Sequence, residues 1–372
     1  MEQRRITIER CLGTEPIIAP TSHWWETGVT FNAAAVYLDR SAANDPIIQA
    51  LLPMRRLTDP ELADGVVAIH YRARPETDPG LPFVRSFIGL ALFSPTLKLL
   101  YRYREPVLYP EPMPQCYDYL GVEDPRITRL GDTFYMLYCG LKADPETIHH
   151  PHLCLASSTD LLHWRKLGAA AGDINKPHNK DGVLFPETFR GKYYMLHRPW
   201  WKGLAHGDYA MCLAASEAPE GPWRDLGEIL HSFRNPKFTQ SWVGAGSVPI
   251  ALGGDRYLVI YHTGNSDAQG KFEYQLDVAM VDFKLLSAGV SRIVTSRIEH
   301  LMVPETPHEL SSSSSLRVQN VVFTCGSYEY QGDIYIVYGG ADTCTMVARV
   351  RKELLVQELE KADLKNPFVA GG

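Results

Sequence analysis

The run GDTFYMLYCG, residues Gly131–Gly140, joins a glycine-aspartate turn signal to a stretch of alternating aromatic and aliphatic residues. Such alternation over roughly five to seven residues, directly after turn residues, is typical of a half-buried β-strand. Four other segments repeat the pattern: DGVVAIHYR (64–72), RGKYYMLHR (190–198), GDRYLVIYHTG (254–264) and QGDIYIVYGG (331–340). The sequence therefore contains five copies of one strand-forming unit.

Each of these strands is followed by a second apolar run, such as SFIGLALF at 86–93 after the first copy. The copies recur at intervals of roughly 60 to 75 residues, and antiparallel strands repeated in this way are typical of a β-propeller. We therefore predict an all-β fold, a five-bladed β-propeller, with residues 1–372 forming a single domain. Helices are expected only at 45–52 and in an amphipathic C-terminal segment, 352–364, and the serine-rich stretch 309–316 is expected to be a loop.

The composition is that of an ordinary globular protein. The 372 residues carry a formal net charge of −6, and this balance argues against a nucleic-acid partner. No run of about 18 apolar residues indicates a membrane span, and the first 20 residues lack the apolar core of a signal peptide. We predict a cytoplasmic protein whose seven scattered cysteines are buried thiols rather than disulfide partners or metal ligands.

Charged and polar residues recur at the ends of the five units, where a propeller gathers them around its central channel. The turn GVEDPRI, residues 121–127, supplies two adjacent acids and a base. The candidates are Asn32, Arg72, Glu123, Asp124, Arg126, Lys180, Asp181, Glu187, His197, Arg198, Tyr261, His262 and Asp342. Each also has a structural explanation, since Asp-Pro initiates turns and strand-end residues act as caps. Their recurrence at one place in successive units favours a shared polar site.

These motifs, in their order along the chain, resemble glycoside hydrolase family 130, the mannoside phosphorylases and β-mannosidases. The resemblance spans residues 15–343, nearly the whole chain. Its motifs are EPIIAP, FNAAA, HYR, GVEDPRI, KDGVLFPE, YYMLHR, VGAGSVPI, YHTG, VPETPHE, NVVFTCG and YGGADT. Members of the family are five-bladed β-propellers, in agreement with the repeats.

The resemblance implies inverting phosphorolysis of a β-mannosidic bond, giving α-mannose 1-phosphate and a shortened acceptor. Asp124 matches the general acid, which protonates the leaving oxygen through a hydroxyl of the mannosyl residue. Lys180 and His197 match positions that bind phosphate. The resemblance assigns Asn32, Arg72, Glu123, Asp181, Tyr261 and Asp342 to substrate binding. The partners are then a β-mannoside oligosaccharide and inorganic phosphate as co-substrate, with no cofactor, no metal, no nucleic acid and no membrane.

One departure from the family pattern keeps a second function open. The phosphorylases carry arginines after the second-unit strand, where this chain has Lys142 and either His150 or His152 as substitutes. Loss of basic residues is typical of the hydrolases, in which a carboxylate activates water. Glu187 and Glu273 are the candidate bases. The alternatives are therefore an inverting β-mannosidase and, from another class, a non-catalytic sugar-binding propeller.

The chemistry also predicts several contacts. A general acid must hold a proton near neutral pH, which requires burial or a second acid nearby. We therefore expect Arg126 to bind Glu123 or backbone rather than the Asp124 carboxylate, and strand alternation to turn Arg198 away from the site.

Three further segments have competing explanations. The pairs Trp24–Trp25 and Trp200–Trp201 are either core or a sugar platform, and the histidines of 148–152 are expected to lie in a loop rather than to bind metal. We hypothesise that the C-terminal segment, 352–364, forms a homo-oligomer contact.

Overall fold

The computed structural model describes residues 6–78, 81, 83–143, 150–176, 178–200, 209–232, 237–310 and 318–362. Its strands are β1 (Glu9–Arg10), β2 (Val29–Leu38), β3 (Val66–Arg74), β4 (Phe87–Phe93), β5 (Leu99–Arg102), β6 (Val122–Leu130), β7 (Thr133–Lys142), β8 (His150–Ser158), β9 (Arg165–Ala169), β10 (His178–Leu184), β11 (Tyr193–Trp200), β12 (Met211–Ser216), β13 (Arg224–Leu230), β14 (Gln240–Ala245), β15 (Ile250–Gly253), β16 (Arg256–Ser266), β17 (Phe272–Asp282), β18 (Val294–Met302), β19 (Val322–Tyr330), β20 (Asp333–Gly340) and β21 (Cys344–Arg351). The α-helices are α1 (Asp45–Leu51), α2 (Pro307–Leu310) and α3 (Lys352–Lys361), and the 3-10 helices are η1 (Pro60–Leu62), η2 (Phe283–Ala288) and η3 (Val290–Ile293).

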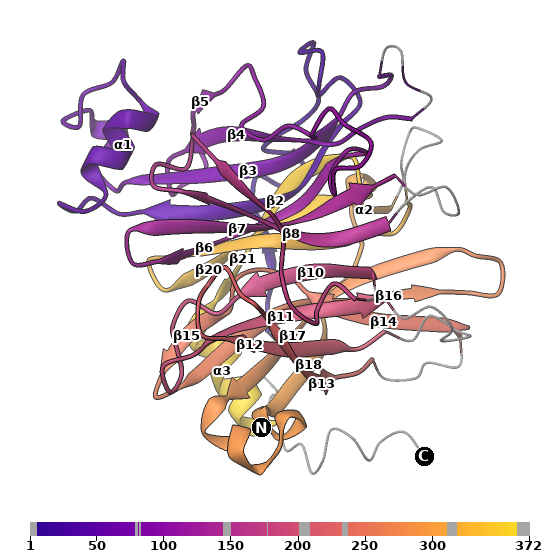
Figure 1. Ribbon diagram of the computed structural model, residues 1–372. Helices are drawn as coiled ribbons and strands as arrows, with labels where there is room; N and C mark the ends of the chain where they lie inside the picture. The colour runs from indigo at the N-terminus through magenta and orange to yellow at the C-terminus, as the bar shows by residue number, and fades with distance from the viewer. Residues whose placement is uncertain are drawn as a thin grey trace.

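The strands form five antiparallel sheets, and these are the blades of a propeller (Figure 1). Blade 1 has the order β2-β3-β4-β5, blade 2 β6-β7-β8-β9 and blade 3 β10-β11-β12-β13. Blade 4 has the order β14-β16-β17-β18 with β15 beside β16, and blade 5 has β19-β20-β21-β1. The first strands of blades 1 to 4 contact one another in order, β19 contacts β16 and β17 of blade 4, and contacts of β19 with β2 close the ring. The prediction of a five-bladed β-propeller is confirmed.

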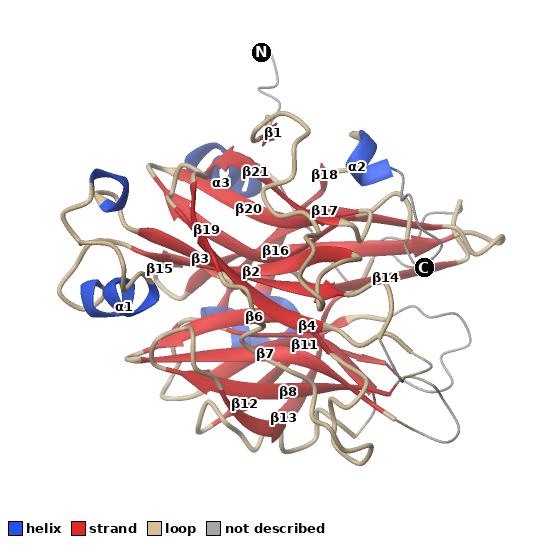
Figure 2. Cartoon of the chain, turned by 90° about the horizontal axis from the view of Figure 1, so that it is seen from above, coloured by secondary structure: helices blue, strands red, loops and turns tan. Residues whose placement is uncertain are grey.

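The five repeated runs are the second strands of the five blades: β3, β7, β11, β16 and β20. Their turn signals form tight hairpins, as between β19 and β20, where Gln331 (φ 51°) and Gly332 (φ 82°) are both left-handed. Two positive φ angles define a type I′ turn, whose twist matches that of the strands. The helix predicted at 45–52 is α1, which projects beside blade 1, and α2 and α3 also lie at the periphery (Figure 2).

Two sequence expectations are corrected or limited by the structure. Glu309 and Leu310 end the short helix α2 and are not loop residues, while 311–317 lie outside the described residues. The C-terminal helix ends at Lys361, and 363–372 lie outside the described residues. The single-domain assignment of 1–372 stays a prediction.

The apolar side chains fill the seams between neighbouring blades. Each seam has its own cluster, for example Met136 and Leu92 between blades 1 and 2, and Val259 and Leu196 between blades 3 and 4. Because alternate residues of a strand point to opposite faces, every blade contributes to two seams. Five of the seven cysteines are buried, and all seven are unbridged thiols. None of the helices in the described ranges is long and apolar enough to cross a membrane.

The N-terminal strand completes the last blade. Glu9 of β1 pairs with Arg349 of β21. The next residue, Arg10, donates from Nε to Oε1 of the fully buried Glu309 at 2.7 Å. The same carboxylate oxygen accepts a hydrogen bond of 2.7 Å from the hydroxyl of Tyr338 in β20. This buried acid therefore ties the start of the chain to its last blade.

Replacing Arg10 with Met should lower the free energy of unfolding by about 3 kcal/mol, because it leaves a buried carboxylate without its cation. The measurement is urea unfolding of both proteins. The control is Arg256→Met, which removes a surface ion pair with Glu360 and should cost under about 1 kcal/mol. Equal losses in the two variants would contradict the role given to Arg10.

Candidate active site

Three innermost strands carry a two-residue bulge at the same level of the channel. The bulges are Asn32–Ala33 in β2, Asp124–Pro125 in β6 and Asp181–Gly182 in β10. The first residue of each is left-handed, with φ of 45°, 51° and 57°. Asn and Asp occupy this region more readily than other residues with a side chain. Bulges re-aim side chains, and these three turn polar groups toward a common centre.

The carboxylates of the GVEDPRI turn share one guanidinium. Asp124 Oδ1 accepts from Asn32 Nδ2 at 2.9 Å and from a terminal nitrogen of Arg72 at 3.1 Å. The other terminal nitrogen of Arg72 donates to Glu123, and Arg72 Nε donates to Ser86 Oγ at 3.0 Å. Adjacent strand residues normally point apart, but the bulge brings both acids to Arg72.

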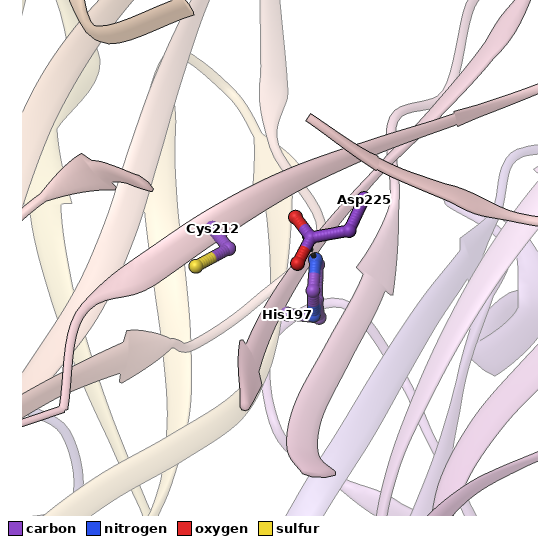
Figure 3. Close-up of side chains that lie close together, drawn as sticks. All are labelled: His197, Cys212 and Asp225. Atoms are coloured by element: carbon purple, nitrogen blue, oxygen red, sulfur yellow. Dashed lines mark ion pairs between the residues drawn. The ribbon is translucent and has the colours of Figure 1, made fainter. Parts of the chain in front are cut away.

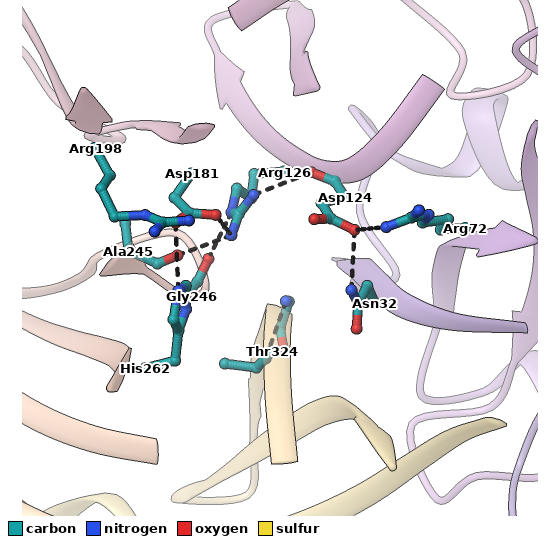
Figure 4. A network of polar contacts seen from close by, with 11 residues as sticks. Asn32, Arg72, Asp124, Arg126, Asp181, Arg198, Ala245, Gly246, His262 and Thr324 are labelled. Carbon is teal, nitrogen blue, oxygen red and sulfur yellow. Dashed lines mark hydrogen bonds and ion pairs between the residues drawn. The ribbon is translucent and has the colours of Figure 1, made fainter. Parts of the chain in front are cut away.

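A second charge network, buried except for the partly exposed Arg198, lies beside the first (Figure 4). Asp181 accepts from Arg126 at 3.2 Å and from Arg198 Nε at 2.6 Å, and His262 Nε2 lies 3.3 Å from it. Arg126 also donates to the backbone oxygens of Asp124, Ala245 and Gly246. The prediction that Arg126 binds backbone rather than the Asp124 carboxylate is confirmed, while its side-chain partner is Asp181 and not Glu123.

Lys180 and Asp342 complete the polar centre. The half-buried ammonium of Lys180 interacts electrostatically with Glu123 and Asp124. Among the described residues it has no hydrogen bond or ion-pair partner within contact distance. The left-handed Asp342 (φ 50°), after β20, interacts with Arg72 and with the carboxylates of Asp124 and Glu123. Four acids and at least four bases therefore converge on one channel.

The two aspartates differ in their protonation. Burial tends to raise the pKa of Asp124, but Arg72, Arg126 and Lys180, helped by the Asn32 hydrogen bond, hold it below its usual value. Burial raises the pKa of Asp342 to about 6, and the neighbouring Asp124 and Glu123 carboxylates add to this against the opposing effect of Arg72. In the unliganded site Asp124 is thus ionised at neutral pH.

The residue opposite each two-residue bulge points away from the channel into the blade. In blades 1 and 2 it is a tyrosine that donates to a carboxylate: Tyr71 to Glu26 at 2.7 Å and Tyr138 to Asp118 at 2.9 Å. In blade 3 it is His197, fully buried, with Nε2 3.5 Å from Asp225. His197 therefore occupies the place of a structural tyrosine, and the structure does not bring it to the channel.

The next residue of the same strand points into the channel. It is Arg72 in blade 1 and Arg198 in blade 3. His262 of blade 4, whose partner strand β14 has no bulge there, also reaches the centre, and each of the three contacts an acid. The expectation that alternation turns Arg198 away is wrong. Tyr261, predicted to bind substrate, lies fully buried in the hydrophobic seam between blades 3 and 4. Arg198 and His262 were already among the sequence candidates, and aligning HYR, LHR and IYH by their last letters would have predicted that these two residues face the channel.

One group of three metal-ligand side chains lies in the described part of the chain: His197, Cys212 and Asp225, with ligand atoms within 4.8 Å of one another (Figure 3). Asn179 Nδ2 donates to Ile174 O at 2.5 Å and lies 3.0 Å from His197 Nδ1. An amide N–H that faces Nδ1 makes it the acceptor and leaves the proton on Nε2. A metal-bound histidine needs the opposite tautomer, so the group does not fit a metal.

The remaining predicted residues lie outside the central cluster. The Lys142 ammonium sits 4.9 Å from the centre of the Tyr117 ring. His150 and His152 belong to β8 and not to a loop, while His149 lies outside the described residues. The candidate bases also lie elsewhere: Glu187 accepts from Tyr257 at 2.9 Å, and Glu273 lies 3.9 Å from Lys237.

The paired tryptophans have divided roles. Trp25 is buried and stacks on Tyr71, whereas Trp24 is half exposed against Phe87. Trp200, at the end of β11, is 41% exposed, and Trp201 lies outside the described residues. Within the first pair, core and surface roles therefore fall on adjacent residues.

Comparison with known proteins identifies the family of this chain. The model of glycoside hydrolase family 130, described as β-1,4-mannooligosaccharide phosphorylase, matches residues 83–361. The chain belongs to this family. It is 28% identical over 346 residues to a 1,2-β-oligomannan phosphorylase of Thermoanaerobacter sp. (strain X514), covering 91% of this chain and 95% of that protein. A β-1,2-mannobiose phosphorylase of the same organism is 29% identical over 354 residues, covering 92% and 97%.

The fold also agrees with solved structures of the family. The β-1,2-mannobiose phosphorylase of Listeria innocua, in complex with β-1,2-mannobiose, superposes with a TM-score of 0.70 at 20% identity, over 96% of this chain and all of that one. A structure described with glycoside hydrolases that target β-1,2-mannosidic linkages in Candida mannan has a TM-score of 0.69 at 21% identity, over 94% and 95%. These likenesses extend over the whole propeller.

Replacing Asp342 with Asn should change how stability depends on pH. The raised pKa means that the folded protein binds this proton more tightly than the unfolded chain. The carboxyl thus contributes stability below about pH 4 that is lost as pH rises through about 6. The melting temperature of Asp342→Asn, relative to wild type, should therefore increase between pH 4 and pH 7. Asp132→Asn, in an exposed turn, is the control, and a constant offset for Asp342→Asn would refute the assignment.

Proposed function

We propose that this protein is a β-mannoside phosphorylase that cleaves a β-linked mannooligosaccharide with inorganic phosphate, inverting the anomeric configuration. The products are α-mannose 1-phosphate and the shortened acceptor. The proposal depends on one observation: the buried Asp124 carboxylate interacts electrostatically with Lys180. Among the described residues, Lys180 has no hydrogen-bond or ion-pair partner, so its charge is available to a phosphate. Family membership and the names of the relatives support it. We also propose that the protein acts in the cytoplasm.

The acid of the reaction is Asp124. It is held by Asn32 and Arg72, so its carboxyl has one orientation, as positioning of a proton donor requires. The family resemblance has it pass its proton to the leaving oxygen through a mannosyl hydroxyl. Asn32, Arg72, Asp181 and Asp342 are then the polar groups that hold the mannosyl ring.

The nucleophile is phosphate, and two cations on paired strands can receive it. Lys180 of β10 pairs in register with Arg198 of β11. Arg198 uses Nε to bind Asp181, while its two terminal nitrogens make no hydrogen bond within the described ranges. A guanidinium with two available N–H groups is suited to bidentate contact with a phosphate. We therefore assign Lys180 and Arg198, rather than Lys180 and His197, to phosphate binding.

Phosphate binding would also prepare the acid. Cations hold the pKa of Asp124 low in the empty site. A bound phosphate adds negative charge beside Lys180, and nearby negative charge favours the protonated form of a carboxyl. Bound phosphate would therefore raise the fraction of Asp124 that carries a proton.

The proposal is tested by product analysis with β-1,2- and β-1,4-mannobiose, with and without phosphate. We expect α-mannose 1-phosphate, seen by 31P NMR, and only in the presence of phosphate. Free mannose at the same rate without phosphate would show an inverting hydrolase instead. Binding of both disaccharides without turnover would support the sugar-binding propeller.

Replacing Asp124 with Asn should lower kcat by about 10²- to 10⁴-fold, the usual contribution of general acid catalysis. An amide retains hydrogen-bonding capacity but has no acidic proton to deliver. Asp132→Asn, in the turn of the same β6–β7 hairpin, should keep full activity. An Asp124→Asn protein with more than a tenth of wild-type kcat would remove the acid role.

The neighbours His197 and Arg198 should respond differently to substitution. His197→Tyr restores the residue type found opposite the bulges of blades 1 and 2, and it should keep the KM for phosphate within about twofold. Arg198→Met should raise that KM at least about tenfold, since one charge-assisted contact is worth about 1.5 kcal/mol or more. Steady-state kinetics with varied phosphate measures both. A tenfold rise in His197→Tyr alone would return the phosphate contact to His197.

A further inference from the structure

Ser86 lies directly before β4 and is almost completely buried at the edge of the polar centre, with 1% of its surface exposed. Its hydroxyl accepts a hydrogen bond of 3.0 Å from Arg72 Nε. The same hydroxyl donates to Glu123 Oε1 at 3.4 Å. A hydroxyl offers one donor and two acceptor positions, so it can serve a cation and an anion at once. Ser86 is therefore a neutral link between Arg72 and Glu123.

The backbone fixes the place of Ser86 between blades 1 and 2. Its carbonyl oxygen accepts a hydrogen bond of 3.1 Å from the N–H of Val122, the first residue of β6. Gly121, with φ of 147°, lies so close that a Cβ added there would stand 2.9 Å from Ser86 N. A side chain at position 121 would therefore displace Ser86, and the chain has glycine at this point.

Arg72 uses each of its three guanidinium nitrogens on a different partner. Nε donates to Ser86, one terminal nitrogen to Asp124 Oδ1 at 3.1 Å and the other to Glu123. The ring of Phe31 lies against the guanidinium, with its centre 4.7 Å from Cζ. Because a guanidinium is planar and its donors point in fixed directions, the bond at Nε sets the rotation of the whole group. Ser86 thereby decides which terminal nitrogen reaches which acid.

We propose that Ser86 is a positioning residue for the general acid: by holding Arg72 Nε, it directs one terminal nitrogen of this arginine onto Asp124 and the other onto Glu123. The inference deepens the proposed function and rests on it, because it takes Asp124 as the acid. Without the hydroxyl, Glu123 loses a hydrogen bond, whereas Asp124 keeps that of Asn32. The guanidinium then turns toward Glu123, and the carboxyl of Asp124 is held less firmly in the orientation that proton transfer requires.

The same movement changes the proton affinity of Asp124. The charged side chains that interact with this carboxyl are Arg72, Arg126, Lys180 and Asp342. Burial tends to raise the pKa of Asp124, and Arg72 comes first among the cations that hold it below its usual value. Moving the guanidinium away weakens this effect, since a nearby opposite charge favours the ionised form. The pKa of Asp124 should therefore rise in Ser86→Ala.

The first experiment is steady-state kinetics of Ser86→Ala with β-mannobiose and phosphate. The variant should lower kcat about tenfold, the usual effect of one hydrogen bond to a charged group, and keep the KM for phosphate within about twofold. The control is Ser94→Ala, just beyond the other end of β4. It also removes two hydrogen bonds, to Thr96 Oγ1 and from Lys98 N, both of 3.0 Å. It should keep kcat within about twofold, because it lies outside the site.

A double-mutant cycle separates positioning from a general effect on the fold. Methionine has no donor for Ser86, so adding Ser86→Ala to Arg72→Met should lower kcat by less than about twofold. An equal loss in both backgrounds, or full kcat in Ser86→Ala, would overturn the inference.

The second experiment measures the pKa of Asp124 directly, by 13C NMR of protein labelled at the aspartate carboxyls. The signal of Asp124 is the one that disappears in Asp124→Asn. A pKa in Ser86→Ala that is unchanged or lower than in wild type would contradict the role of Ser86, whatever the kinetics show.

The two experiments also distinguish this inference from the proposed function. If wild type releases free mannose without phosphate, the same kcat comparison is made on that reaction, and a loss in Ser86→Ala would retain the positioning role and reject phosphorolysis. If wild type turns over neither disaccharide, the NMR titration decides alone. A raised pKa of Asp124 in Ser86→Ala would then retain the hold of Ser86 on this carboxyl through Arg72, with the proposed function rejected.

Discussion

The polar centre depends on the buried guanidinium of Arg126. Its nitrogens reach the backbone of Asp124 in blade 2, the carboxylate of Asp181 in blade 3 and two carbonyls of blade 4. A buried charge is tolerated only when it is paired and fully hydrogen-bonded, and this one meets both conditions. Three blades are thereby fixed in register at the level where the bulges project their side chains. Because the site is built from residues of separate blades, the relative positions of its side chains depend on these contacts of Arg126.

The carboxylates around Arg126 fall into two groups that differ in their pKa values. Asp181 is saturated by Arg126, Arg198 and His262, and its pKa is held well below the usual value by Arg198, His262 and Arg126 against the effect of burial. Asp181 therefore stays ionised at any working pH. Asp124 and Asp342 have environments that push their pKa values apart, a pattern typical of sites that move protons. The distinction follows from which cations face each carboxylate.

Much of the fold could be predicted from the sequence, because the repeated strand signal is local. The alternation in segments such as GDTFYMLYCG and the turn residues before them act within a few residues, and five copies limit the architecture to one family of folds. The identity of several site residues was also accessible, since Asn32, Arg72, Asp124, Asp181 and Asp342 do converge. The wrong assignments concern which of two adjacent strand residues faces the channel. A bulge adds one residue to a strand, so strict alternation then predicts the wrong residue of the pair. His197, opposite the bulge of β10, and Tyr261, in a strand paired with β14 without a bulge, were each chosen one position too early. The contacts of Arg126 with Asp181 and Gly246 could not be predicted locally, because they depend on how separate blades meet.

The completion of blade 5 by the N-terminal strand has a consequence for biosynthesis. The contact between Glu9 and Arg349 joins residues 340 positions apart. At about 5–20 residues per second, the ribosome synthesises Arg349 tens of seconds after Glu9. During that interval β1 has no strand to pair with, and the seam between blades 1 and 5 is open. Contacts so distant in sequence are slow to form. The ring is therefore closed only after blade 5 has been synthesised, and the nascent chain depends on its early blades remaining soluble until then.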